Sequence, residues 1–106
     1  MNVLADFIEQ EKERPCELCG RITQLTRHHL IPRTRHRNKR TQKRFSRQEM
    51  QTRLLWVCRS CHHHIHRCIS EKELANNYNN KERLLTHPDI QKFVAWIARR
   101  PNTFKA

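Results

Sequence analysis

Residues 58–66 read CRSCHHHIH, so a CxxC pair is followed directly by a cluster of histidines. Two earlier stretches carry matching residue types, CELCG at 16–20 and HHLIP at 28–32. Two CxxC pairs supply four thiolates, which is enough to close one metal site. The histidines beside the second pair can form another site together with His28 and His29. The chain therefore predicts one cysteine site for structure and one histidine site for chemistry.

The composition describes a small chain with room for a modest core. Its 106 residues are 36% hydrophobic and have a mean hydropathy of −0.97, so we expect one domain over 1–106 whose small core is supplemented by a metal or a disulfide. Five cysteines, four of them in CxxC pairs, fit bound metal in a reducing compartment better than a secreted disulfide framework.

The same sequence gives no sign of export or membrane insertion. The N-terminal MNVLADFIEQ lacks the basic and continuous apolar regions of a signal peptide. The longest strongly apolar run, LLWVC at 54–58, is too short to span a bilayer. We therefore expect an intracellular protein without a membrane partner.

Positive charge is concentrated in one segment. Lys and Arg number 22 against 10 Asp and Glu, and the net charge of +12 favours a polyanionic partner such as nucleic acid. Residues 33–47, RTRHRNKRTQKRFSR, hold eight of the 22 basic residues and no acidic residue. This basic loop is either a solvated surface or address tag, or a phosphate-binding segment. We favour phosphate binding because the loop lies between the two halves of the histidine site.

The basic loop has one aromatic residue, Phe45, so it predicts backbone contacts more than base stacking. The candidate nucleic-acid contacts are Arg33, Arg35, Arg37, Lys39, Arg40, Lys43 and Arg44.

Local patterns predict short helices and strands. Residues 2–13 have an apolar stripe at helical spacing that stops before Pro15, and 22–29 are expected to form a β-hairpin or extended pair. Four helices are expected in the remainder, and the last two form a helical extension over 70–100. The first of the four is a short helix capped by Ser46 and Glu49, and the second covers 60–68. The third is capped by Ser70 and Glu73 and broken by the asparagines at 76–80, and the fourth begins at Pro88 and ends at Pro101.

The four paired cysteines are the expected ligands of a structural zinc. A CxxC turn presents two thiolates, and 38 residues separate the two turns, so the intervening segment is an insertion pinned at its base. The alternative, a pair of redox dithiols, is disfavoured because no βαβ pattern surrounds them. A fifth cysteine, Cys68, has no evident partner and is interpreted as a buried or idle thiol. The expected zinc ligands are Cys16, Cys19, Cys58 and Cys61.

The histidines are dense enough to predict a second site. Seven of the eight fall between 28 and 66. On the helix after Cys61, His62 and His66 are four apart and share one face, which suits a metal. His63 with His66 is the competing pair, and we favour His62 with His66.

With these elements in this order, residues 16–66 resemble the HNH endonucleases of the ββα-metal superfamily. The resemblance rests on TRHHLIP at 26–32 and on CRSCH at 58–62 followed by His66, with the paired CxxC motifs enclosing them. It implies a small α+β fold, a ββα-metal core over 16–68 with flanking N- and C-terminal helices, and a four-cysteine zinc site. It also implies an enzyme that hydrolyses phosphodiester bonds of DNA.

The resemblance further implies roles for individual histidines. His29 matches the general base, while His28, His62 and His66 match the ligands of one catalytic divalent metal. All-imidazole ligation suits Mn²⁺, Ni²⁺ or Zn²⁺ better than Mg²⁺, which prefers oxygen. The family's asparagine that orients the base would fall near Arg53, where this chain reads QTR at 51–53. Gln51 or a backbone carbonyl is the expected substitute.

Two other classes of protein share some of these features. A non-catalytic zinc-finger nucleic-acid binder explains the charge and the cysteines but leaves the histidines without a role. A metal-storage or redox module explains the ligands but not the charge of +12. The nuclease interpretation accounts for all three features.

Overall fold

The computed structural model describes residues 13–105, which form a small α+β arrangement of two short antiparallel sheets and several helices. The helix predicted over 2–13 lies, except for Glu13, outside these residues. The described elements are β1 (Arg14–Pro15), β2 (Ile22–Thr23), β3 (Leu25–His29), the 3-10 helix η1 (Arg33–Arg35), α2 (Lys39–Arg44), α3 (Arg47–Thr52), β4 (Leu54–Cys58), α4 (Arg59–Cys68), α5 (Glu71–Asn77), α6 (Lys81–Leu84) and α7 (Pro88–Ile97).

The longer sheet is a two-stranded ribbon made by residues that are far apart in sequence. β3 pairs with β4, with Leu25 opposite Cys58 and His29 opposite Leu54. β2 pairs instead with β1 across the CELCG turn. Of the two predicted forms of 22–29, the hairpin is therefore wrong, while the segment does form two extended strands. The segment has none of the glycine or asparagine residues that a tight hairpin turn requires, so each half finds its partner elsewhere.

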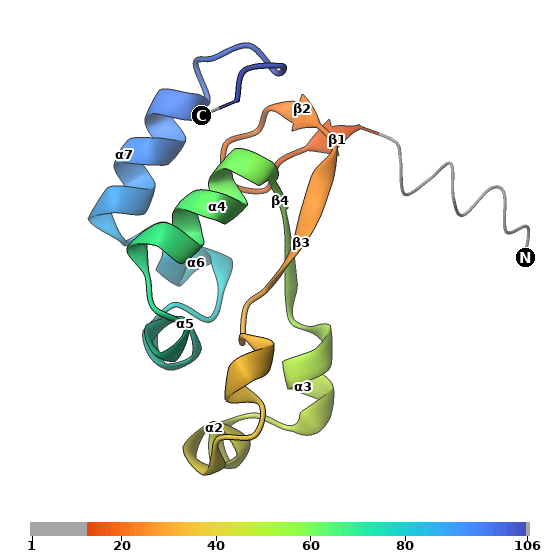
Figure 1. The fold of residues 1–106 in the computed structure, drawn as a ribbon, viewed down its shortest axis with the longest axis vertical. Coiled ribbons are helices and arrows are strands. Elements are labelled where there is room, and N and C mark those ends of the chain that lie inside the picture. The colour runs from red at the N-terminus through yellow and green to blue at the C-terminus, as the bar shows by residue number, and fades with distance from the viewer. Residues whose placement is uncertain (1–12, 106) are drawn as a thin grey trace, which may run out of the picture.

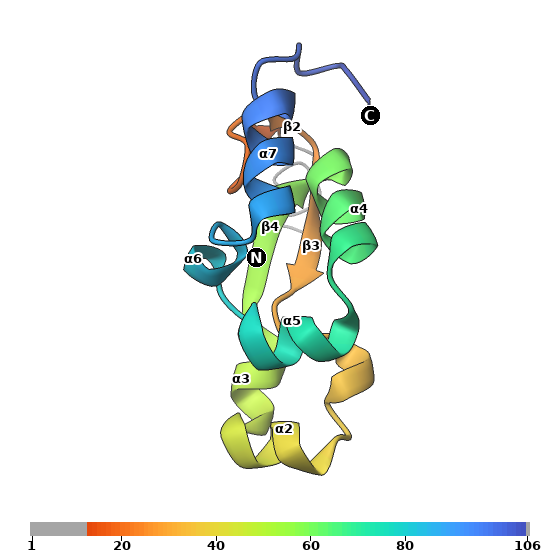
Figure 2. The same cartoon turned by 90° about the vertical axis from the view of Figure 1, so that its left-hand side faces the viewer.

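Helix α4 follows β4 without a loop and lies against both strands of the ribbon (Figures 1 and 2). Its start is one residue earlier than predicted, because the sulfur of Cys58 accepts a hydrogen bond from the backbone N–H of Cys61 and caps the helix. The main core lies between α4, the ribbon and the C-terminal helices. Its most deeply buried apolar side chains are Val57, Ile65, Ile69, Leu74, Leu84, Ile90 and Ile97.

Helix α7 packs on α4 and begins at Pro88 as predicted (Figure 1). It ends at Ile97, earlier than the predicted stop at Pro101. Before the proline the backbone tightens to three-residue hydrogen bonds, from Arg99 to Trp96 and from Arg100 to Ile97. Proline disfavours α-helical geometry in the residue before it, so the α-helix ends ahead of Pro101.

The basic segment 33–47 is more ordered than a loop. It contains η1 and α2, and the side chain of Asn38 caps α2 by accepting from the N–H of Thr41 at 3.1 Å. Ser46 and Glu49 form the predicted capping box of α3. Together α2 and α3 occupy the end of the molecule away from α7 (Figure 1). A second small core lies beneath them, formed by Ile31, Phe45, Met50 and Ala75.

The remaining helices are short. Ser70 caps α5 by accepting from the N–H of Glu73, and the helix stops at Asn77 within the predicted asparagine run. The hydroxyl of Thr34 hydrogen-bonds to the carboxylate of Glu71, which joins η1 to α5. Across residues 13–105, no helix has both the length and the apolar character needed to cross a membrane.

Candidate functional site

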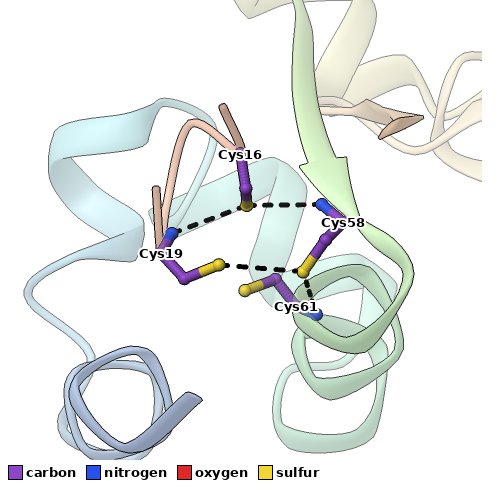
Figure 3. Close-up of side chains that lie close together, drawn as sticks. All are labelled: Cys16, Cys19, Cys58 and Cys61. Atoms are coloured by element: carbon purple, nitrogen blue, oxygen red, sulfur yellow. Dashed lines mark hydrogen bonds between the residues drawn. The ribbon is translucent and has the colours of Figure 1, made fainter. Parts of the chain in front are cut away.

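The four paired cysteines converge on one point, as predicted. Their sulfurs lie within 4.8 Å of one another, and they approach from the CELCG turn, the end of β4 and the first turn of α4 (Figure 3). The sulfurs of Cys19 and Cys58 are 3.8 Å apart. This separation is too long for a disulfide but matches the edge of about 3.8 Å expected for a tetrahedron with zinc–sulfur bonds of about 2.3 Å. The cluster suits a metal such as zinc.

The backbone of the CELCG turn is shaped to stabilise thiolates. Gly20 has a φ of 80°, a left-handed conformation that lets its N–H return to the carbonyl of Cys16 at 2.9 Å. The sulfur of Cys16 accepts from the N–H groups of Leu18, Cys19 and Cys58 at 3.3–3.5 Å. Hydrogen bonds from the side chains of Cys16 and Cys61, followed by the N–H of Cys61 and the Arg21 guanidinium, lower the pKa of Cys58, whereas hydrogen bonds with Cys16 and Cys58, followed by burial, raise the pKa of Cys61.

Arg21 is a buried cation beside this cluster that was not predicted from the sequence. It is 5% exposed. Its Nη2 lies 3.7 Å from the sulfur of Cys58, and its Nη1 donates to the carbonyls of Pro101 and Phe104 at 2.8 Å each. A guanidinium in this position would offset the negative charge that four thiolates retain when they hold a divalent metal. Its place directly after the glycine of the first CxxC turn is the signal that could have indicated it.

His28, His62 and His66 form a second cluster, at the other half of the ribbon. Ligand nitrogens of the three rings lie within 4.8 Å of one another. Ring centroids are 5.3 Å apart for His28–His62, 5.2 Å for His28–His66 and 5.1 Å for His62–His66, so the rings surround one point almost symmetrically. His63 is exposed and belongs to no such group in the described part of the chain, so His62 is the neighbour of His66 in the cluster.

His28 is the most unusual member of the cluster. Its side chain is fully buried, and within residues 13–105 neither ring nitrogen has a hydrogen-bond partner. Burial, followed by the charges of His62, His66 and His29, lowers its pKa to about 3. A buried polar group without a partner is costly. A neutral imidazole with an available lone pair, facing two more imidazoles, is suited to bind a metal that supplies the missing partner.

The ring of His62 has one nitrogen already engaged. Its Nδ1 lies 2.7 Å from the hydroxyl of Thr26, and that hydroxyl donates to the carbonyl of Val57 at 3.0 Å. Thr26 and His28 are two apart on β3, so both side chains face α4. Thr26 belongs to the TRHHLIP motif, but the sequence alone indicates no role for it. Burial, followed by the charges of His66 and His29, lowers the pKa of His62.

His29 follows His28 at the end of β3 and is partly exposed. Burial, followed by the positive charges of Arg33, His36 and Arg27, lowers its pKa, so the ring is neutral at pH 7 and able to accept a proton. Among residues 13–105 neither Gln51 nor a backbone carbonyl hydrogen-bonds to the ring, so the predicted orienting group is not found. Arg53, at the expected asparagine position, donates to the carbonyl of Asn79 at 3.0 Å instead.

The basic segment lines a hollow of about 1020 Å³ that is shared by η1, α2 and α3. Phe45 is 9% exposed and sits under the guanidinium groups of Arg44 and Arg53, so its face is covered. Of the predicted nucleic-acid contacts, Arg35 is half-buried. The other six are exposed, namely Arg33, Arg37, Lys39, Arg40, Lys43 and Arg44.

Cys68 is not without a partner, contrary to prediction. It is half-buried, and its sulfur lies 3.1 Å from Nε2 of His64. The ring of His64 in turn stacks on Phe93 with centroids 4.0 Å apart. The stacking of His64 on Phe93 joins α4 to α7, and both Cys68 and His64 lie outside the two clusters.

Comparison with known proteins identifies one informative relative. The chain is 37% identical over 89 residues to the uncharacterised protein YisB of Bacillus subtilis (strain 168), covering 81% of this chain and 75% of that protein. No protein-family model matches the chain, and no solved structure matches it. The extent of the match to YisB places both proteins in one family.

Proposed function

We propose that this chain, which belongs to the same family as YisB of Bacillus subtilis (strain 168), is a metal-dependent endonuclease that hydrolyses phosphodiester bonds of DNA. The observation that carries the proposal is the buried His28, whose two ring nitrogens have no partner within residues 13–105 and which faces His62 and His66. His29 lies close enough to lower the pKa of both His28 and His62, and it is a neutral, partly exposed histidine suited to act as a base.

The order of elements supports a ββα-metal nuclease core. β3, β4 and α4 correspond to its two strands and helix, with His28 on the first strand and His62 and His66 on the helix. In this interpretation the cysteine cluster is a structural zinc site that joins the CELCG turn between β1 and β2 to the end of β4 and the first turn of α4. The separation of the two sites fits two metals with different tasks, one closed and one accessible to substrate.

The residues of the histidine cluster would hold one divalent transition metal through three imidazole nitrogens. A metal bound there supplies Lewis-acid stabilisation of the charge that develops on the phosphate and on the leaving oxygen. His29 takes a proton from the attacking water, and its lowered pKa keeps it in the required neutral form. His28 stays neutral down to about pH 3, which keeps its lone pair available for the metal.

The exposed cations of the basic segment would bind phosphates next to the scissile bond. Arg33 lies four residues after His29 and contributes to lowering its pKa, so the basic surface begins at the site itself. Lys39, Arg40 and Lys43 extend it along α2. Because the face of Phe45 is covered, this surface is suited to contacts with the sugar–phosphate backbone and not to base stacking.

A plasmid-nicking assay tests this function. Supercoiled plasmid is incubated with protein that carries one zinc per chain, with and without added Mn²⁺, Ni²⁺, Mg²⁺ or Zn²⁺, and then with excess chelator. We expect conversion to nicked or linear DNA that depends on the added metal. His63→Ala is the matched control, since His63 is an exposed histidine next to His62 on α4 but outside the cluster.

The outcomes separate the proposal from its rivals. Metal-dependent cleavage supports the nuclease if, at low concentrations of added metal, His28→Ala reduces it strongly and His63→Ala does not. DNA binding without cleavage under every metal would instead indicate a non-catalytic zinc-finger nucleic-acid-binding protein. Metal uptake with neither binding nor cleavage would indicate a metal-storage module.

A further inference from the structure

We propose that Thr26 is a positioning residue that fixes His62 in the Nδ1–H tautomer and so directs its Nε2 lone pair to the metal. The inference deepens the proposed function and rests on it in one respect, namely that the histidine cluster binds a metal. Thr26 would not touch the metal but would hydrogen-bond to the other ring nitrogen of a ligand, and the loss of such a partner typically weakens metal binding by about 10- to 100-fold.

The hydrogen-bond directions follow from the number of protons available. A threonine hydroxyl has one proton to donate and two lone pairs with which to accept. The Thr26 hydroxyl donates to the carbonyl of Val57 at 3.0 Å, and a carbonyl can only accept. Its proton is therefore used, and the contact of 2.7 Å with Nδ1 of His62 is satisfied when the ring nitrogen donates.

The consequence for His62 is a defined tautomer. A neutral imidazole carries one N–H, so a proton on Nδ1 leaves Nε2 as the nitrogen with the free lone pair. Metals bind that lone pair. Two hydrogen bonds thus fix the ring before any metal binds. They connect the Val57 carbonyl on β4 to the Thr26 hydroxyl on β3, and that hydroxyl to Nδ1 of His62 on α4.

A comparison with His28 shows why His62 is the ligand that needs this relay, meaning the two hydrogen bonds that link the Val57 carbonyl, the Thr26 hydroxyl and Nδ1 of His62. The side chains of Thr26 and His28 both lie on the face of β3 toward α4. Within residues 13–105, however, the ring nitrogens of His28 have no hydrogen-bond partner at all. Burial alone fixes the position of His28, whereas His62 is half-exposed and needs a hydrogen bond to fix its ring. Thr26 supplies that bond.

Three variants test the role. Thr26→Val keeps a β-branched side chain of similar shape for the strand but removes the hydroxyl, and Thr26→Ser restores the hydroxyl. Thr23→Val is the matched control, because Thr23 is a partly exposed strand threonine on the neighbouring β2. Each protein is prepared with one zinc per chain, and Ni²⁺ binding is then measured by calorimetry, with nitrogen NMR of the His62 ring recorded before Ni²⁺ is added.

We expect Thr26→Val to weaken Ni²⁺ binding by about 10- to 100-fold, the usual effect of removing a group that orients a ligand. Thr26→Ser and Thr23→Val should stay within about threefold of the unchanged protein on the same scale. The His62 ring should be in the Nδ1–H form in the unchanged protein and shift toward the Nε2–H form in Thr26→Val. A merely structural role for Thr26 would not move this tautomer signal.

Several results would overturn the inference. They are an unchanged Ni²⁺ affinity in a folded Thr26→Val protein, a Ser variant as weak as the Val variant, or a His62 ring in the Nε2–H form in the unchanged protein. If the Val variant fails to fold, Thr26→Ala with the same measurements takes its place. Failure of the proposed function is separate: Ni²⁺ binding that depends on Thr26 in a protein that cuts no DNA would refute the nuclease and support the relay.

Discussion

Nη2 of Arg21 lies 3.7 Å from the sulfur of Cys58, and the same guanidinium donates through Nη1 to two carbonyls of the C-terminal tail. One buried side chain thus joins the cysteine cluster to Pro101 and Phe104, residues at the far end of the sequence. The guanidinium that binds the two carbonyls of the tail is therefore the same group that contacts a sulfur of the cysteine cluster. We therefore expect the stability of the tail and of the cysteine site to be coupled.

Replacing Arg21 with methionine tests this coupling, because methionine keeps an apolar stem but removes every donor. We expect a loss of about 2–3 kcal/mol in the free energy of unfolding, the size of a buried hydrogen bond from a charged group. Backbone amides of the tail should exchange faster and zinc should leave to a chelator sooner. Arg99→Met, at an exposed position after α7, is the control. Equal unfolding free energies for the two variants would show that Arg21 contributes nothing beyond its bulk.

The cysteine site should determine whether the protein folds. A closed thiolate site contributes roughly 10 kcal/mol or more in small zinc-binding peptides. Cys58→Ser should therefore yield protein without stoichiometric zinc and without cooperative unfolding, as judged by metal analysis and circular dichroism. Cys68→Ser serves as the comparison, since its thiol contacts His64 and lies outside the cluster. A zinc-free Cys58→Ser protein that unfolds cooperatively at the usual temperature would contradict this expectation.

How far the sequence determines these sites depends on whether the decisive contacts are local. The CxxC spacing and the capping pair at Ser46 and Glu49 are local patterns, and the structure confirms both. The partner of β3 is not local, because β4 begins 25 residues after β3 ends and a pattern within 22–29 carries no information about it. Pairing was therefore predicted wrongly where a distant strand competed with a nearby one.

The histidine cluster shows the same division. Around a helix, His62 and His66 are about 40° apart and His63 and His66 about 60°, so spacing alone hardly distinguishes the pairs. The direction in which α4 faces β3 decides between them, and only the tertiary structure gives it. The roles of Thr26 and Arg21 were missed for this reason as well, since each depends on a contact with residues more than 30 positions away.

The basic segment should govern DNA affinity through its exposed side chains. Replacing Arg37, Lys39, Arg40 and Lys43 with alanine should weaken binding on every DNA sequence. It should also flatten the log–log dependence of affinity on salt by about 0.9 for each phosphate that the variant no longer binds. Fluorescence anisotropy at several salt concentrations measures both. An equal reduction in charge at Lys72, Lys92, Arg99 and Lys105 is the control, and equal effects of the two sets would indicate attraction by net charge alone.

The buried His28 should make the protein without metal in its histidine site sensitive to acid. Its pKa is about 3 in the folded chain against an ordinary value of 6.5. The unfolded chain therefore binds a proton as the pH falls below about 6.5, while the folded chain does not until about pH 3. Because only the unfolded chain gains this proton, the free energy of unfolding falls as the pH is lowered from about 6.5 to about 3, and it is unaffected by His28 above about pH 6.5.

A leucine at position 28 removes this titration and provides the comparison. Between pH 7.5 and 5.0 the unchanged protein should lose about 2 kcal/mol more unfolding free energy than His28→Leu, at about 1.4 kcal/mol for each pH unit below 6.5. Urea unfolding at the two pH values, with one zinc per chain in both proteins, measures it. The comparison cancels protonation of the thiolates, because both proteins share that site. Parallel loss of stability in the two proteins would show that His28 is protonated in the folded chain.

The adjacent histidines His28 and His29 should fail in different ways when replaced. His29→Ala leaves the three ligands in place, so Ni²⁺ affinity and DNA affinity should be retained while cleavage drops by about 10²- to 10⁴-fold, the contribution of a general base. His28→Ala removes a ligand, so Ni²⁺ binding should weaken and raising the Ni²⁺ or Mn²⁺ concentration should restore part of the cleavage. Single-turnover cleavage measured across metal concentrations separates the two. The reverse result, with His29→Ala rescued by metal and His28→Ala not, would exchange their roles, and normal cleavage by both would place the reaction elsewhere in the molecule.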